Sequence, residues 1–199
     1  MASPGHESET HGWIDENLLS GGLIDVGSCC GAFSLRHAQF DTIIAIEPSG
    51  ENFGALQRNV TLNGRSATLV HAAAGASPGR IRLFLTASDT HSTIGSGRYE
   101  EVAAVTVDQI WRDAGRPRIS LLKIDVEGAE PDVIRGAGEL LETGPFVIAE
   151  ANTETARTIL TDALRANGFQ LLKRLDSANY LFEPSESAGT SNPLILQES

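Results

Sequence analysis

Three segments of this sequence carry side chains that could take part in chemistry, and each follows a short apolar run. The first is IDVGSCCG, which contributes Asp25, Val26, Gly27, Ser28 and Gly31. Glycines at such a turn let a ligand approach the backbone closely, as at the nucleotide sites of open α/β sheets. The spacing differs from the GxGxxG of dinucleotide sites, and a tight strand-to-helix turn without a ligand is the alternative.

The second segment holds Glu47 and Pro48, about 20 positions after Gly27. A carboxylate at this place can accept the hydrogens of both ribose hydroxyls. A solvated acid at the end of a strand is the alternative. Together with Asp25 and the glycine turn, Glu47 favours a site for a cofactor that carries an amine and ribose hydroxyls but no phosphates.

The third segment is LLKIDVEGAE, an apolar run that ends in three acids. Asp125 and Glu127 are candidates for a general base, for orienting an ammonium group or for holding a divalent cation. Glu130 suits the first turn of a helix, where acids are favoured by the helix dipole. Lys123 lies within the apolar run, and because a buried ammonium requires a partner we expect it to pair with one of these acids.

The elements that position these segments alternate between β-branched runs and helical patterns, which is typical of βαβ units. The fold class is therefore α/β with a mostly parallel sheet. Strands are expected over residues 23–27, 42–47, 67–71, 120–125 and 146–150, and helices over 32–39, 50–62, 107–114, 131–141 and 154–167.

Two further pairs of strands depart from this alternation. Residues 80–86 and 101–107 are expected to form an inserted antiparallel ribbon, joined by a loop over 87–99 that is rich in Ser, Thr and Gly. Residues 170–175 and 180–182 are too close in sequence for a parallel crossover, so a hairpin is expected there. The sheet should therefore hold one antiparallel strand near its end.

Composition excludes several classes of protein. The chain has 199 residues, a net charge of −11 and 41% hydrophobic residues, which predicts one globular domain and disfavours binding to nucleic acid or to a membrane. The only cysteines are the adjacent Cys29 and Cys30, so no disulfide framework is expected. No stretch approaches the roughly 20 apolar residues of a bilayer helix, and MASPGHESETHGW has neither a basic start nor an apolar run, so a cytoplasmic protein is predicted. We expect a helical segment over 1–22, a domain over 23–183 and a disordered tail over 184–199.

In order and spacing, the motifs of this chain resemble those of the FkbM-type S-adenosylmethionine-dependent methyltransferases. The motifs are IDVGSCCGAFSL, IEPSGENFGALQRNVTLNG, HAAAG followed by GRIRLFL, VTVDQI, and LLKIDVEGAEPDVIRGA followed by PFVIAE. The resemblance extends from about Glu7 to Pro184. It implies a single Rossmann-like, seven-stranded methyltransferase fold with an antiparallel final strand and an inserted β-ribbon after the third strand.

The resemblance also implies roles for residues. Asp25, Gly27 and Gly31 would surround the methionyl part of S-adenosylmethionine, and Glu47 would hold its ribose. Further positions carried over from the family are Ala73 and Ala74 within residues 72–75 near the adenine, Ser92 and Thr93 in the ribbon, and Asp125, Glu127 and Glu150 facing the cleft. Those three acids are also the candidate ligands if a divalent ion such as Mg²⁺, which is possible but not required, is used.

One departure from the family lies in the first turn, where such proteins usually carry GANIG and this chain has GSCCG. We expect Cys29 and Cys30 to be small buried residues beside the cofactor. A redox-sensitive thiol pair is the alternative.

The reaction expected from the resemblance is O-methylation of a hydroxyl on a small molecule, a natural product or a glycosyl group. Asp125 or Glu127 is the predicted general base, with His91 of the loop as an alternative. His71 is expected to be structural. The competing hypotheses are a non-catalytic protein that binds S-adenosylmethionine and an NAD-dependent dehydrogenase. The identity of the acceptor and the oligomeric state are left open.

Overall fold

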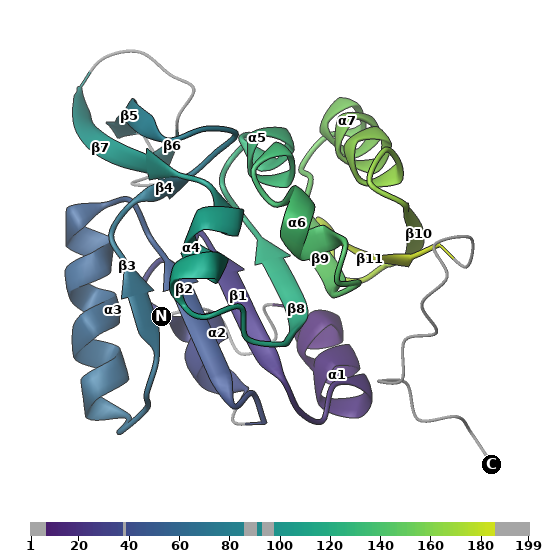
Figure 1. The fold of residues 1–199 in the computed structure, drawn as a ribbon, viewed down its shortest axis with the longest axis horizontal. Helices are drawn as coiled ribbons and strands as arrows, with labels where there is room; N and C mark the ends of the chain where they lie inside the picture. The colour runs from purple at the N-terminus through teal and green to yellow at the C-terminus, as the bar shows by residue number, and fades with distance from the viewer. Residues whose placement is uncertain (1–6, 38, 86–90, 93–97, 186–199) are drawn as a thin grey trace.

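The computed structural model describes residues 7–37, 39–85, 91–92 and 98–185. Among these, seven strands form one sheet in the order β10-β11-β9-β8-β1-β2-β3 (Figure 1). The strands are β1 (Gly22–Val26), β2 (Thr42–Ile46), β3 (Thr68–Val70), β8 (Ile119–Ile124), β9 (Phe146–Glu150), β10 (Phe169–Arg174) and β11 (Asn179–Pro184).

The sheet is parallel except at β11. β1 pairs in parallel with β2 and β8, and β8 pairs in parallel with β9. β11 runs antiparallel to both β9 and β10. The predicted mostly parallel sheet and its terminal hairpin are therefore confirmed.

Helices cover both faces of this sheet (Figure 1). Residues of α1, α2 and α3 pack in the apolar clusters on one face, and residues of α4 to α7 pack in the largest cluster on the other. The helices are α1 (Ser8–Asn17), α2 (Ala32–Arg36), α3 (Gly50–Leu62), α4 (Val107–Asp113), α5 (Glu130–Arg135), α6 (Gly138–Leu141) and α7 (Glu154–Arg165).

A second, smaller sheet lies beyond the carboxyl end of β3, in the order β4-β7-β5-β6 (Figure 1). The antiparallel pair of β5 (Gly79–Leu85) and β7 (Tyr99–Val105) is the predicted ribbon. The short strands β4 (Ala73–Ala74) and β6 (His91–Ser92) were not anticipated. They are too short to show a periodic pattern in the sequence.

Several predicted features lie outside the described residues. Thr93 and most of the predicted loop over 87–99 belong to this group, and so does nearly all of the predicted tail over 184–199. His91 and Ser92 are described through the backbone pairing of β6 with β5, and their side chains are outside the description.

The helix predicted over 131–141 is wrong as a single element, because α5 ends at Arg135 and α6 begins at Gly138. A Cβ at Gly136 would lie 2.1 Å from the Gly75 carbonyl oxygen, so the chain passes close to the second sheet at this point. Asp108 accepts hydrogen bonds of 3.0 Å from the backbone N–H groups of Glu139 and Leu140. This side chain begins a new helix where the first one stops.

Asp176, in the turn between β10 and β11, fixes α1 to the hairpin at one edge of the seven-stranded sheet. The Asp176 carboxylate accepts hydrogen bonds from the N–H groups of Glu9 (3.1 Å) and Thr10 (2.9 Å) and from the Thr10 hydroxyl (2.6 Å). Trp13 of α1 packs edge-on against Phe146, with ring centroids 5.0 Å apart. These contacts position the start of α1, including Glu7, near the core strands.

No helix in the described part of the chain combines the length and apolar character needed to cross a bilayer.

Candidate active site

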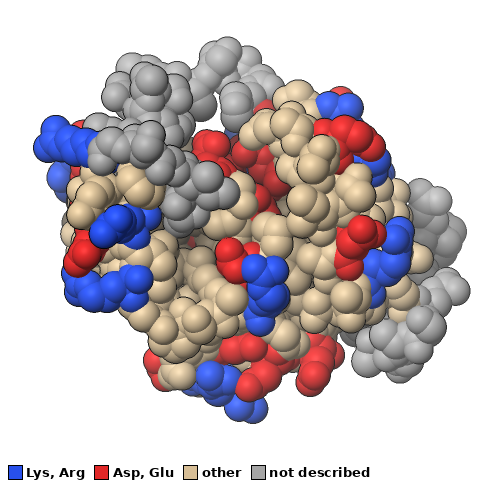
Figure 2. Space-filling model, turned by 90° about the horizontal axis from the view of Figure 1, so that it is seen from above, with Lys and Arg blue, Asp and Glu red and all other residues tan. Residues whose placement is uncertain are grey.

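A pocket of about 220 Å³ opens at the carboxyl ends of β1, β2 and β8. Seen from that end, acidic side chains gather around the hollow at the centre of the molecule (Figure 2). The pocket is lined by Val26, Gly27, Cys29, Ile46, Glu47, Pro48, Asn52, Ala72, Ala73, Ala74, Leu83, Asp125, Val126, Glu127 and Ala129. Seven of the predicted cofactor-binding positions are among these residues: Val26, Gly27, Glu47, Pro48, Ala73, Ala74 and Asp125.

Gly27 brings the ends of three strands together. Its φ is +83°, and a Cβ at this position would lie 1.8 Å from the Asp125 carbonyl oxygen. Its N–H donates to the Ile46 carbonyl at 3.0 Å, and the Asp125 N–H donates to the Val26 carbonyl at 2.9 Å. Only glycine combines this conformation with so close an approach.

Glu47 is the buried acid of the pocket, with 4% of its surface exposed. One carboxylate oxygen accepts from the Cys29 N–H and the other from the Ser49 N–H, each at 2.9 Å. The side-chain amide of Asn52 also donates to the oxygen that accepts from Ser49, at 3.5 Å, so Glu47 joins the turn after β1 to the start of α3.

The expectation that both cysteines are buried is wrong for Cys29. Its backbone has a φ of +50°, which accompanies the hydrogen bond from its N–H to Glu47 and leaves the residue exposed at the pocket wall. Cys30 is half-buried, and both thiols are free.

Three predicted cofactor residues lie behind the pocket and support its wall. Asp25 is buried and accepts a hydrogen bond from the Ser34 hydroxyl. Burial raises the pKa of Asp25 to about 6, against the lowering effect of Lys123. The Ser28 hydroxyl donates to the Ile46 carbonyl at 3.3 Å. Gly31, with a φ of +85°, packs so closely that a Cβ would lie 2.6 Å from the Leu56 side chain.

One side of the pocket is apolar. Ala72, Ala73 and Ala74 are buried at its edge, and Leu83 of β5 reaches it from the second sheet. Small side chains beside Pro48 leave a smooth surface on which a flat ring can lie.

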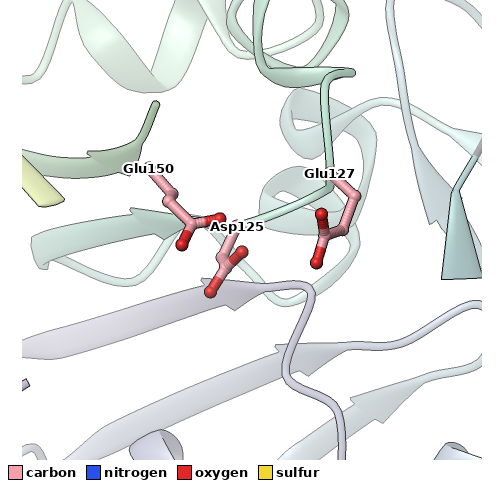
Figure 3. A group of neighbouring side chains, drawn as sticks. All are labelled: Asp125, Glu127 and Glu150. Carbon is pink, nitrogen blue, oxygen red and sulfur yellow. The ribbon is translucent and has the colours of Figure 1, made fainter. Parts of the chain in front are cut away.

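Asp125 and Glu127 follow β8, Glu150 ends β9, and one carboxylate oxygen of each acid lies within 4.8 Å of the other two. Figure 3 shows Asp125 between the other two side chains, with the Glu150 carboxyl group turned toward it. The structure thus brings together the three acids predicted to face one cleft. Hard oxygen ligands of this kind suit Mg²⁺ or a similar cation.

The close approach of these acids changes their acidity. Burial, followed by the charge of Asp125 and a hydrogen bond with it, raises the pKa of Glu150 to about 7. Partial burial and the neighbouring acids also raise the pKa of Glu127. Like charges so close together disfavour full ionisation, so a proton can be held within this cluster near neutral pH.

Lys123 is the buried cation of the site, and its predicted pairing with an acid is confirmed. Its Nζ lies 3.0 Å from Asp125 Oδ2 and 4.0 Å from Glu7 Oε1, and it lies over the Phe33 ring, 5.3 Å from the centroid. Burial alone would lower the pKa of Lys123, but Asp125, Asp25 and Glu7 outweigh it and the net shift is upward.

The other predicted candidates have structural positions or no described side chain. Glu130 lies in the first turn of α5 and accepts from the N–H groups of Val126 (3.3 Å) and Gly128 (3.1 Å). His71 stacks on Phe53, with centroids 4.7 Å apart, and contacts the Pro48 carbonyl. His91 cannot be placed relative to the acids, because only its backbone is described.

Two polar residues near Lys123 and the cluster of Asp125, Glu127 and Glu150 were not predicted to belong to the site. They are Glu7 and Asn179. Asn179, at the start of β11, donates from Nδ2 to Glu7 Oε1 at 2.8 Å. Asn179 directly faces Glu150 across the antiparallel pair of β11 and β9. Neither Glu7 nor Asn179 belongs to a recognisable motif, and only the folded topology brings them to Lys123.

Comparison with known proteins agrees with this architecture. Residues 23–171 match the family model of the methyltransferase FkbM domain. The chain belongs to the FkbM methyltransferase family. It is 26% identical over 131 residues to the hexuronic acid methyltransferase AglP of Haloferax volcanii, a match that covers 64% of this chain and 54% of that protein.

Solved structures show the same fold. An FkbM methyltransferase from Methylobacillus flagellatus superimposes with a TM-score of 0.58 at 21% identity, over 82% of this chain and 43% of that one. A precorrin-6y C5,15-methyltransferase from Geobacter metallireducens gives 0.59 at 13% identity, over 91% of this chain and 87% of that one. The chain thus spans about half the length of the Haloferax and Methylobacillus proteins that it matches.

Proposed function

We propose that this chain is an S-adenosylmethionine-dependent O-methyltransferase that acts on a hydroxyl of a glycosyl group or another small molecule. The observation that carries the proposal is the pocket itself, which is lined by the glycine turn, Glu47 and three alanines, and which Asp125 joins to the acid cluster. The name of the Haloferax relative, a hexuronic acid methyltransferase, supports the glycosyl class of acceptor.

The pocket residues fit the parts of this cofactor. Glu47 would hold the ribose hydroxyls, the wall formed by Pro48 and Ala72 to Ala74 would face the adenine, and the turn at Gly27 would lie along the methionyl part. The bound cofactor supplies an electrophilic methyl group on a sulfonium. The residues of this chain have to hold the acceptor oxygen in line with that group, at roughly 3 to 3.5 Å.

Asp125 is the base that this geometry favours. It lines the pocket, and Lys123 fixes one of its oxygens at 3.0 Å. When the acceptor oxygen bonds to the methyl carbon and the carbon–sulfur bond breaks, the hydroxyl proton passes to a carboxylate of the cluster. S-adenosylhomocysteine and the methyl ether are the products. If a divalent cation takes part, Asp125, Glu127 and Glu150 are the residues that would hold it.

The test is transfer of a labelled methyl group from S-adenosylmethionine to hydroxylated acceptors, including glucuronosides, with Mg²⁺ and with a chelator. Asp125→Asn is expected to lower turnover by about 10²- to 10⁴-fold, the usual contribution of a positioned base. Asp132→Asn, on α5 with its side chain 51% exposed, is the matched control and should be unaffected. Unchanged turnover in Asp125→Asn would contradict the assigned base, and unchanged turnover in Glu127→Gln as well would exclude both acids from that role. Cofactor binding without transfer to any acceptor would favour the non-catalytic alternative.

A further inference from the structure

A buried polar subsite lies next to the acid cluster, where α1, β8 and β11 meet. Its members are Lys123 and Asn179, which are 2% and 4% exposed, and the carboxylate of Glu7 between them. Asn179 donates to Glu7 through Nδ2. Its Oδ1 is buried without a hydrogen-bond partner among the described residues. A buried acceptor without a donor is costly and calls for a ligand that supplies one.

Glu7 reaches this subsite from an unusual backbone conformation. It precedes α1 with a φ of +59°, in the left-handed region that a residue with a side chain rarely adopts. Its side chain is 19% exposed, whereas that of Lys123 is 3% exposed. Glu7 is therefore the most exposed of the three residues, and it contacts both Lys123 and Asn179 through the same oxygen.

We propose that Lys123 and Asn179 form a subsite for the carboxylate of an acidic acceptor, and that Glu7 occupies it in this structure as a substitute. The ligand class is a hydroxy acid of the sugar-acid type. Its carboxylate would accept from Lys123 Nζ and Asn179 Nδ2, and a hydroxyl beside the carboxylate would donate to Asn179 Oδ1. This inference rests on the proposed function, which it refines by adding a carboxylate to the acceptor.

Charge favours such an exchange. The subsite already holds a carboxylate against Lys123, so replacing the Glu7 group by a ligand carboxylate leaves the buried charge unchanged. A neutral sugar would instead leave Lys123 with fewer opposing charges, and it offers no group of matching shape.

The location agrees with a role in acceptor binding. Lys123 Nζ lies 3.0 Å from Asp125 Oδ2, and Asn179 faces Glu150 across the β11–β9 pair. An acid held by its carboxylate at this point has its other hydroxyls beside the acid cluster.

The experiment is calorimetric titration of the full chain with D-glucuronate and with D-glucose. Glu7→Ala removes the competing carboxylate and is expected to bind D-glucuronate at least about tenfold more tightly than the wild type. D-glucose should bind neither protein measurably. Glu9→Ala removes the same charge from an exposed position in α1 and should behave as the wild type. Adding Lys123→Met to Glu7→Ala should abolish the gain.

Three outcomes would overturn the inference. These are equal affinity of the Glu7→Ala and Glu9→Ala variants for D-glucuronate, equal binding of D-glucose, and a gain that survives Lys123→Met. If the double variant does not fold, Asn179→Leu in the Glu7→Ala background tests the same contact from the other side. Titration with S-adenosylmethionine in parallel separates the two proposals, because failed cofactor binding with intact D-glucuronate binding refutes the proposed function alone.

Discussion

Glu47 is a single side chain on which both the shape and the chemistry of the pocket depend. It is buried, it accepts hydrogen bonds from the N–H groups of Cys29 and Ser49, and it lines the pocket. We predict that Glu47→Gln lowers the affinity for S-adenosylmethionine by about 10- to 100-fold, because an amide offers a ribose diol one acceptor oxygen in place of two. Calorimetric titration measures this loss.

Glu51→Gln is the matched control for Glu47→Gln, since it removes the same charge from an exposed position in the first turn of α3. Equal affinities in the two variants would exclude Glu47 from cofactor binding. A melting curve for each variant separates a lost contact from a lost fold.

Glu150 makes stability depend on pH. Its pKa is raised from 4.5 to about 7 in the folded protein, first by burial and then by Asp125. A carboxyl group whose pKa is raised on folding adds to the free energy of unfolding. This contribution is complete below the pKa of the unfolded chain and is lost as pH rises through the folded pKa of about 7. Glu150→Gln cannot ionise. We predict that the free energy of unfolding of this variant, relative to that of the wild type, is larger at pH 8 than at pH 5.

Urea denaturation at both pH values measures this difference. Glu142→Gln, at an exposed position after α6, is the comparison. A stability difference between Glu150→Gln and the wild type that is the same at pH 5 and pH 8 would show that Glu150 ionises as an ordinary acid.

The residues of the pocket differ in how far the sequence could predict them. Gly27, Glu47 and Asp125 stand at the ends of recognisable strands, so the sequence pattern alone predicts that they share one sheet edge. Asp25, Ser28 and Gly31 belong to the same motif but lie behind the wall, because side chains alternate between faces and the turn curls away. Glu7 and Asn179 could not be found this way, since their proximity depends on the docking of α1 against β11.

At the scale of elements, the junction of β1, β2 and β8 depends on the missing side chain at Gly27. We predict that Gly27→Ala destabilises the protein by at least about 3 kcal/mol and abolishes cofactor binding, because its Cβ would overlap the Asp125 carbonyl. Gly64→Ala is the control. Gly64 has a φ of +60° in open space, so strain alone should cost about 1 kcal/mol. Equal losses in chemical denaturation would show that conformation, and not close approach, explains Gly27.

The docking of α1 depends on Asp176. Burial would raise the pKa of Asp176, but hydrogen bonds from Thr10 and Glu9 outweigh it and the net shift is downward. We predict that Asp176→Ala costs about 1 kcal/mol, as for a lost helix cap. The difference in free energy of unfolding between this variant and the wild type should be complete above pH 3.8, the ordinary pKa of the carboxyl group. It should shrink as pH falls below that value. Ser177→Ala is the control, and a cost that persists unchanged at low pH would contradict this role.

Element boundaries were predicted well where the apolar pattern is long and poorly where neighbours decide. The strands that flank the pocket shift by one residue at most in β1, β2 and β8. The break between α5 and α6 was missed because it comes from Asp108 and from the close passage of Gly136 by Gly75. Both are contacts between segments that are distant in sequence.

At the scale of the whole molecule, the order of the strands explains why the chemistry gathers at one edge. β1 lies between β8 and β2, so the glycine turn, Glu47 and the Asp125 cluster come from three adjacent strand ends. The antiparallel β11 brings Asn179 to that same edge. The alternation of strands and helices predicts this order in broad outline, whereas the second sheet over the pocket depends on pairings as short as two residues.

The most direct test of the cofactor assignment is calorimetric titration of the wild-type chain with S-adenosylmethionine, S-adenosylhomocysteine and NAD. We predict that both sulfur ligands bind at one site and compete with each other, and that NAD does not bind. A folded protein that binds neither sulfur ligand, or that binds NAD in their place, would contradict the assignment.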